Sequence, residues 1–270
     1  MIIMNAFSKR ATTYDTHSFI QKEVNNRLLS RLDLIKHDKS NVLEIGSGTG
    51  KLSQDLQQKY PHVNIISMDS SYEMSLVHKK KNDKAKCVVG NAENLPFQLS
   101  TFDTLLSSLT LHWCNIDSNL FVKFSNLLIP NGLLLFSVAG PDTFKEFKKC
   151  PPDIYEKLRF NAYLDMHHYG DFLLHSDFKD PVVDNEQITI EFSTFSQLLK
   201  SIRLTGTNIT DSLNREHITK SEYNTIKSCL YNDASGSFEL TYDIIYGYAL
   251  KPAKTLNKSG KLINIKEIKK

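Results

Sequence analysis

A short apolar segment that runs into a glycine-rich turn is the part of this sequence best suited to bind a ligand. Val42–Ile45 leads directly into the Gly-x-Gly-x-Gly turn Gly46–Gly50, and Asp69 stands nineteen positions after that turn, where the next apolar segment ends. Such a turn brings backbone close to a nucleotide-like ligand, and an acid at the next strand end accepts the ribose hydroxyls. The arrangement therefore predicts a nucleoside-containing ligand.

The glycine spacing and its acidic neighbour indicate the class of ligand. A dinucleotide site has the spacing G-x-G-x-x-G, whereas here the spacing is one residue shorter and Glu44 precedes the turn. A carboxylate would repel a pyrophosphate, which favours a cationic ligand. S-adenosylmethionine fits, because it carries a sulfonium and an ammonium and no phosphate. Glu44 lies in an apolar strand and needs a partner, so we expect it to hold the loop or the ligand's amino end.

Three further segments supply candidate contacts, each with a plainer alternative. Asn91–Glu93 follows a strand and can bond the adenine edge, or it is a turn with an exposed Asn. Met74 can pack on the adenine ring or belong to the core. Leu109 and His112 end another strand and can face the ligand, although His112 is equally well a structural histidine. Trp113, the only tryptophan, suits a cavity wall.

Composition excludes several classes of protein. Hydrophobic residues make up 40% and charged residues 23%, as in ordinary globular chains, and no apolar run approaches the roughly 18 residues that span a bilayer. The four cysteines lack metal or disulfide spacing, which indicates reduced thiols in a cytoplasmic protein. His167–His168 has no third ligand at metal spacing, and basic–aromatic interleaving typical of nucleic-acid binding is missing. We therefore expect no metal, nucleic acid or membrane.

The net charge of +3 comes from the end of the chain. Residues 251–270 contain seven lysines and one acid, so the first 250 residues carry a net charge of −3. The sequence predicts one domain over residues 1–252 and a basic, flexible tail over 253–270. We expect a monomer.

The order of apolar patterns predicts a doubly wound α/β fold. Strands alternate with helices up to Val138, which indicates a Rossmann-like, mostly parallel sheet, here with an antiparallel last strand at Leu240–Leu250. A helix is predicted over 8–35, and Pro130–Gly132 is expected to close a later helix. Residues 1–35, 141–176 and 193–236 are expected to form a cap over the ligand edge of the sheet. The predicted strands are 41–45, 63–69, 86–89, 102–109, 133–138 and 181–190, and the predicted helices are 51–60, 72–81, 119–128, 195–204 and 221–230.

Several segments together resemble class I methyltransferases. These are Ala11–Asp15, the glycine turn, Asn91–Phe97 and Leu111–Cys114. Two narrower segments resemble the malonyl-[acyl-carrier protein] O-methyltransferases of biotin synthesis, namely Gly140-Pro141-Asp142-Thr143-Phe144 and Leu240-Thr241-Tyr242 with the residues that follow. The resemblance covers residues 5–252 and leaves out the tail.

The resemblance implies S-adenosylmethionine as methyl donor and S-adenosylhomocysteine as product, with Tyr14 and Gln21 closing over the methionine end. Two residues depart from the family, which commonly has Asp at position 91 and often Gln at position 112. The expected cofactor contacts are Tyr14, Gln21, Glu44, Gly46, Ser47, Gly48, Asp69, Ser70, Met74, Asn91, Ala92, Glu93 and Leu109.

The resemblance also implies methylation of the free carboxylate of malonyl-[acyl-carrier protein], with Arg203, Tyr14 and His112 orienting the substrate. Such a carboxylate is already ionised, so no general base is needed. An acidic carrier would dock on basic residues of the cap, with Lys145, Lys148, Lys149, Lys157 and Arg159 as candidates. A sister group of arginine hydroxylases that assist respiratory complex I assembly, and a non-catalytic assembly factor of the same fold, are the alternatives; Arg203 favours the methyltransferase.

Overall fold

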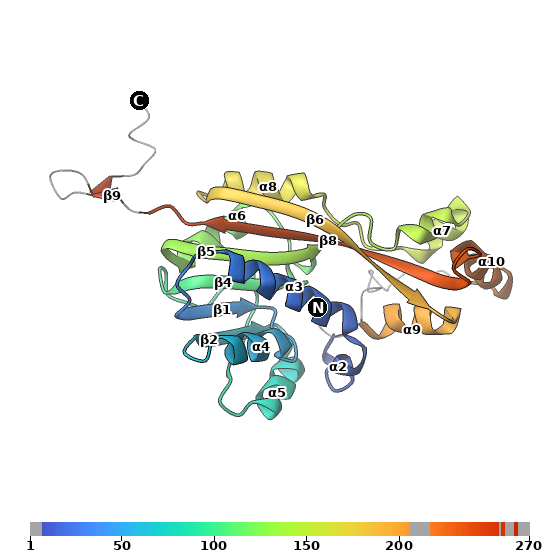
Figure 1. The fold of residues 1–270 in the computed structure, drawn as a ribbon, viewed down its shortest axis with the longest axis horizontal. Coiled ribbons are helices and arrows are strands. Elements are labelled where there is room, and N and C mark those ends of the chain that lie inside the picture. Colours follow the sequence, from blue (N-terminus) through green and yellow to red (C-terminus); the bar gives the residue numbers. More distant parts are fainter. Residues whose placement is uncertain (1–6, 206–216, 254, 257–261, 264–270) are drawn as a thin grey trace.

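The computed structural model describes residues 7–205, 217–253, 255–256 and 262–263. An eight-stranded sheet forms its centre (Figure 1). Seven strands follow the order β3-β2-β1-β4-β5-β8-β6, and β7 pairs with the start of β8. The strands are β1 Asn41–Ile45, β2 Asn64–Asp69, β3 Lys86–Val89, β4 Phe102–Ser108, β5 Leu128–Ala139, β6 Lys179–Phe192, β7 Tyr231–Asn232 and β8 Ser237–Leu250.

The first five strands are parallel, and helices connect most of them. β5 pairs antiparallel with β8, which in turn pairs antiparallel with β6. The predicted parallel, doubly wound sheet with an antiparallel last strand is therefore confirmed, and β6 extends it by a further strand. The helices are α2 Tyr14–His17, α3 Phe19–Leu34, α4 Lys51–Lys59, α5 Tyr72–Lys81, α6 Ser118–Leu127, α7 Pro152–Leu158, α8 Met166–Leu174, α9 Phe195–Thr205 and α10 Lys220–Leu230, with 3₁₀ turns η1 Leu111–Trp113 and η2 Lys145–Lys149.

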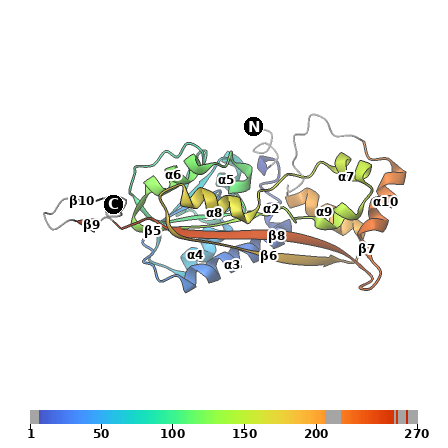
Figure 2. The same ribbon diagram turned by 90° about the horizontal axis from the view of Figure 1, so that it is seen from above.

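Side chains of β5 alternate between two hydrophobic clusters, one on each face of the sheet. Leu133 and Leu135 join the cluster that α3 and α4 cover, whereas Leu134 and Phe136 join the cluster beneath α6 and α8. Figure 2 shows these two helix layers on opposite sides of the strands. Period-two alternation along a strand buried on both faces produces this division, which makes the sheet a rigid support for residues at its carboxyl edge.

Beyond the parallel strands, β6 and β8 continue as a long ribbon toward α7, α9 and α10 (Figures 1 and 2). These three helices and η2 belong to the same hydrophobic cluster as the first half of β8, through residues such as Phe147, Ile202 and Ile226. They come from segments predicted to form a cap. α8 differs, because it packs against α6 and β6 and so belongs to a layer of the sheet.

Two predicted boundaries are wrong. The helix predicted over 8–35 is interrupted at Ser18, whose ψ of 41° is not helical and whose hydroxyl donates to Asp15 O at 3.3 Å, so α3 begins only at Phe19. Pro130–Gly132 does not close a helix, since α6 ends at Leu127 and these residues lie within β5. Asn131 N–H instead donates to Lys251 O at 3.0 Å, which joins the strand to the chain after β8.

Beyond Ala253 only Thr255–Leu256 and Leu262–Ile263 are described, as the antiparallel pair β9–β10. The rest of the tail predicted to be flexible lies outside the described residues. Within the described ranges, each helix is too short or too polar to cross a bilayer. Nor does the described part of the chain gather three or more His, Cys, Asp or Glu side chains around a point where a metal ion would fit.

Candidate functional site

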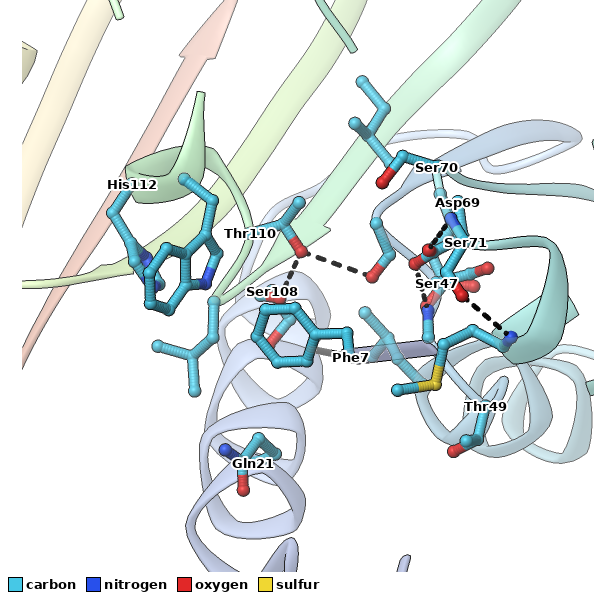
Figure 3. A pocket seen from close by; sticks show the side chains of 18 of the residues that line it. Phe7, Gln21, Ser47, Thr49, Asp69, Ser70, Ser71, Ser108, Thr110 and His112 are labelled. Carbon is cyan, nitrogen blue, oxygen red and sulfur yellow. Dashed lines mark hydrogen bonds between the residues drawn. The ribbon is translucent and has the colours of Figure 1, made fainter. Parts of the chain in front are cut away.

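A cavity of about 550 Å³ lies where the carboxyl ends of the parallel strands meet the N-terminal segment (Figure 3). Cavities of this size hold small-molecule ligands in many proteins. Every residue predicted to contact the cofactor lines this cavity, and so does His112. His112 and Asp69 lie on opposite sides of it, with Ser108 and Thr110 between them (Figure 3).

The glycine turn owes its shape to backbone angles and crowding that exclude other residues. Gly46 has φ of +77°, and a Cβ there would lie 2.0 Å from Thr110 Oγ1. Its N–H and that of Ser47 donate to Met68 O at 2.8 and 3.0 Å, so the turn folds over the end of β2. Gly48 also has positive φ, but nothing lies within 4 Å of an added Cβ. The turn is therefore packed on one side and open to the cavity on the other.

Asp69 has a second role besides the predicted one. Its two carboxylate oxygens accept from Gly48 N–H and Ser71 N–H, each at 2.8 Å, so Asp69 joins the glycine turn to the start of α5. Burial raises the pKa of Asp69, and these two N–H donors oppose the rise. Each oxygen keeps a further lone pair, which leaves the carboxylate able to accept ribose hydroxyls.

Glu44 is a buried carboxyl group without a cationic partner among the described residues. Ser67 Oγ donates to its Oε2 at 3.1 Å, and Ser53 also hydrogen-bonds it. Burial raises the pKa of Glu44 to about 8, although both serines lower it. A positive charge in the cavity would lower that pKa and stabilise the carboxylate. The site therefore suits a cationic ligand better than an anionic one.

The N-terminal segment covers the cavity. The Phe7 ring packs edge-on against Trp113, with centroids 5.7 Å apart, and Tyr14 is half-buried beneath it. Asp15 fixes the segment to the glycine turn, because Thr49 Oγ1 donates to one of its oxygens at 2.5 Å and Lys81 forms an ion pair with the other. Burial, reinforced by Asp69 and Asp15, raises the pKa of the Tyr14 phenol.

Unsatisfied polar atoms test whether the predicted cofactor fits. Gln21 Oε1 and Ser47 Oγ are buried without a partner in the described structure, and both residues line the cavity. Buried polar groups are nearly always hydrogen-bonded, so these two atoms indicate a polar ligand between α3 and the glycine turn. The ammonium and carboxylate of a methionine moiety match this requirement, and the residues present therefore fit S-adenosylmethionine.

Met74 of α5 and the residues that follow β3 complete the far end of the cavity. Met74 is 2% exposed and Ala92 is 8% exposed, so together they form an apolar wall suited to an adenine ring. Asn91 Oδ1 accepts from Glu93 N–H at 2.9 Å. The side-chain NH₂ of Asn91 can donate to a ring nitrogen, where an aspartate could only accept.

The cavity continues past Leu109 into a region that sequence reasoning largely missed. Leu109 adopts φ of +47°, rare for a non-glycine residue, at the end of β4. Here Thr143, Tyr163, Tyr242 and Ile244 line the cavity beside His112. Only the segments that resemble the methyltransferases, Gly-Pro-Asp-Thr and Leu-Thr-Tyr, hinted at Thr143 and Tyr242. Tyr163 had no signal.

The structure does not place Arg203 in this cavity. Arg203 lies on α9 with an exposed side chain and is not among the lining residues. The helical repeat explains this, because the buried residues Leu198 and Ile202 face the core and turn position 203 outward. Arg203 therefore does not line the cavity in this arrangement, and its direct contact with the substrate carboxylate stays a prediction. The residues that follow, through Asn208, lie largely outside the described residues.

Comparisons with known proteins indicate a methyltransferase, as the geometry of the site does. The family profile described as a methyltransferase domain matches residues 43–136, which contain the glycine turn and Asp69. A malonyl-[acyl-carrier protein] O-methyltransferase of Legionella pneumophila is 32% identical over 264 residues, covering 96% of this chain and 93% of the relative. The protein of that name from Gallionella capsiferriformans is also 32% identical, over 269 residues.

Solved structures share the fold at low identity. The YcgJ protein of Bacillus subtilis superposes with a TM-score of 0.60 at 16% identity, over 83% of this chain and 97% of its own. Phosphoethanolamine N-methyltransferase 2 of Haemonchus contortus, solved with S-adenosyl-L-methionine, has a TM-score of 0.53 at 19% identity, over 84% of this chain and 52% of its own. Fold, cavity and near-full-length similarity agree, and the chain belongs to the malonyl-[acyl-carrier protein] O-methyltransferase family of S-adenosylmethionine-dependent methyltransferases.

Proposed function

We propose that this methyltransferase esterifies the free carboxylate of malonyl-[acyl-carrier protein], giving the malonyl methyl ester that primes pimeloyl synthesis for biotin. The similarity to relatives of that name along almost the whole chain supports this acceptor. The site supports a carboxylate acceptor independently, because the protonation states of the residues around Leu109 do not suit an acceptor that needs a general base.

The observation that carries the proposal is that no described residue of the acceptor wall is a suitable general base. The acceptor wall is the part of the cavity formed by His112, Thr143, Tyr163, Tyr242 and Ile244. Burial lowers the pKa of His112 to about 3, too low for efficient proton abstraction at neutral pH. Burial also raises the pKa of Tyr163, which therefore stays protonated. An amine or alcohol acceptor would need a base here, whereas a carboxylate with a pKa near 4 is already ionised.

S-adenosylmethionine supplies an electrophilic methyl group when it is bound. The protein's contribution is to align the acceptor with that methyl and to exclude water. Phe7, Tyr14 and Trp113 close the cavity from the N-terminal side. The acceptor wall is carried by the segments that follow β4 and β5, by the connection before α8 and by β8. Alignment of this kind can contribute about 7–11 kcal/mol, and it needs neither an acid nor a base.

The carrier partner is proposed to dock on the cap. Of the five basic candidates, Lys148 pairs with Asp142 at 3.1 Å and Lys157 pairs with Glu222 at 2.6 Å, while Lys145 donates to Gln187 Oε1. Lys148, Lys149 and Arg159 are exposed. An acidic carrier would meet these three first, and steering by such charges changes the association rate more than the affinity.

The test is a turnover assay with purified protein, malonyl-carrier and methyl-labelled cofactor. We expect a product heavier by one methylene that releases labelled methanol on mild alkaline hydrolysis. Succinyl-carrier and acetyl-carrier serve as controls, because acetyl-carrier has no free carboxylate. Label transfer to acetyl-carrier, or no ester from malonyl-carrier with cofactor demonstrably bound, would contradict the proposal.

A further inference from the structure

His112 presents a donor of fixed direction to the cavity. Ala139 N–H donates to His112 Nδ1 at 3.3 Å. An amide N–H can only donate, so Nδ1 carries the lone pair and the neutral ring carries its proton on Nε2. No described residue accepts from Nε2, and the ring lines the cavity with partial exposure. His112 is therefore a neutral N–H donor held in place by the end of β5.

Tyr163 presents a second neutral donor next to the first. Its ring packs edge-on against His112, with centroids 5.4 Å apart and an interplanar angle of 87°. Asn161 Nδ2 donates to Tyr163 Oη at 3.4 Å. The phenolic oxygen thus already accepts one hydrogen bond, which leaves its own proton to be donated elsewhere, and Tyr163 also lines the cavity.

The lysines of the cavity wall are engaged elsewhere. Within the described residues, Lys22 and Lys51 are the lysines that line it, and no arginine does. Lys22 Nζ donates to Asp15 O at 2.7 Å, and Lys51 pairs with Asp55 at 2.6 Å. Both lie on the cofactor side, in α3 and α4. Among the described residues, an anion at the acceptor wall would therefore meet neutral donors and no lysine or arginine.

We propose that His112 Nε2–H and Tyr163 O–H together form an acceptor-carboxylate subsite, in which they hold one carboxylate oxygen while the other faces the methyl donor. This inference rests on the proposed function. In the reaction an oxygen–carbon bond forms, the sulfur–carbon bond breaks, its electron pair goes to sulfur, and no proton is taken up or released.

Neutral donors suit this chemistry. Esterification removes the negative charge of the acceptor, so a donor that binds the anion strongly holds the ground state more tightly than the transition state. Two neutral donors orient the carboxylate at smaller cost to its nucleophilicity than a bidentate guanidinium would impose. The ester product accepts weaker hydrogen bonds than the carboxylate and leaves readily.

The test compares Tyr163→Phe, His112→Leu and His112→Gln by steady-state kinetics with malonyl-carrier. Loss of one hydrogen bond to a charged group should raise KM about 10- to 100-fold in Tyr163→Phe and His112→Leu, with kcat much less changed. His112→Gln should recover most of the affinity that His112→Leu loses, because a glutamine side chain also offers an acceptor and a donor. Tyr155→Phe, a cap tyrosine that does not line the cavity, is the matched control.

Two measurements separate this inference from its premises. Cofactor affinity should be unchanged in all variants, which excludes general damage to the fold. Binding of malonyl-pantetheine to the protein saturated with S-adenosylhomocysteine reads the subsite without turnover, and should weaken in parallel with KM. Unchanged malonyl-pantetheine affinity in the Tyr163→Phe/His112→Leu double variant would overturn the subsite. If that affinity falls while wild-type protein forms no ester, the proposed function fails and the subsite stands.

Discussion

Cofactor binding should release a proton from Glu44. The carboxyl group is 3% exposed and accepts a hydrogen bond from Ser67, with Asp69 and Asp55 as its charged neighbours. Its pKa is raised to about 8 by burial, so it is mostly protonated at pH 7 in the free protein. A bound ligand with a sulfonium and an ammonium would return this pKa toward its ordinary value near 4.5.

The magnitude follows from the pH. At pH 6, two units below the pKa of about 8, removing the proton costs about 2.7 kcal/mol, or a factor of about 100 in affinity. At pH 9 the cost vanishes. The dissociation constant of S-adenosylmethionine should therefore fall about tenfold per pH unit between pH 6 and 8. The same shift makes the free protein less stable as pH rises from about 4.5 through about 8, because the raised pKa favours the protonated form.

Titration calorimetry at pH 6, 7, 8 and 9, in buffers of different ionisation enthalpy, measures both the affinity and the proton released. Glu44→Gln is the matched control, since it keeps the shape of the side chain and cannot ionise. The amino group of the ligand titrates near pH 8 in both proteins, so the difference between them isolates Glu44. A wild-type slope equal to that of Glu44→Gln would refute the reasoning.

Three further perturbations address other parts of the site. Gly46→Ala should lower the free energy of unfolding by at least the roughly 1–3 kcal/mol of a strained residue and should weaken cofactor binding, because its Cβ would meet Thr110. Gly48→Ala, which has open space for a Cβ, should cost less stability in thermal melts. Equal losses in the two variants would contradict the packing argument. Asp15→Asn should speed release of the product cofactor up to about fivefold and abolish the salt dependence of that release. Fluorescence of the single tryptophan follows the release. An unchanged release rate would show that contacts other than those of Asp15 hold the N-terminal segment in place. Arg203→Ala should leave kcat within about threefold of wild type, because the side chain is exposed. A hundredfold loss of kcat would show that Arg203 contacts the substrate.

The cofactor half of the site was predictable because its signals are local. A strand, a glycine turn and an acid at the next strand end lie within Val42–Asp69, and parallel strands bring such ends to one edge of the sheet. What the pattern could not show is how the groups pair. Asp69 accepts from Gly48 N–H, and Glu44 has no cationic partner among the described residues. Both facts depend on how side chains from three segments are placed.

The acceptor half was harder to predict because distant segments assemble it. Thr143 follows β5, Tyr163 lies in the connection before α8, and Tyr242 belongs to β8, with no fixed spacing between them. The prediction for Arg203 rests on different reasoning, and it stays a prediction. Its charge suggested a carboxylate partner, although the apolar repeat through Leu198 and Ile202 already indicated that it faces outward.

The position of β8 has a consequence for how the chain folds as it is synthesised. β8 ends at Leu250, yet it lies between β5 and β6, so both of its long-range pairings wait until residues 237–250 have been made. Until β8 leaves the ribosome, β5 presents an unpaired edge and β6 has no neighbour. Unpaired edges invite misassociation, and such late, non-local pairing slows folding. A truncation that removes β8 should therefore aggregate during translation rather than yield a smaller methyltransferase.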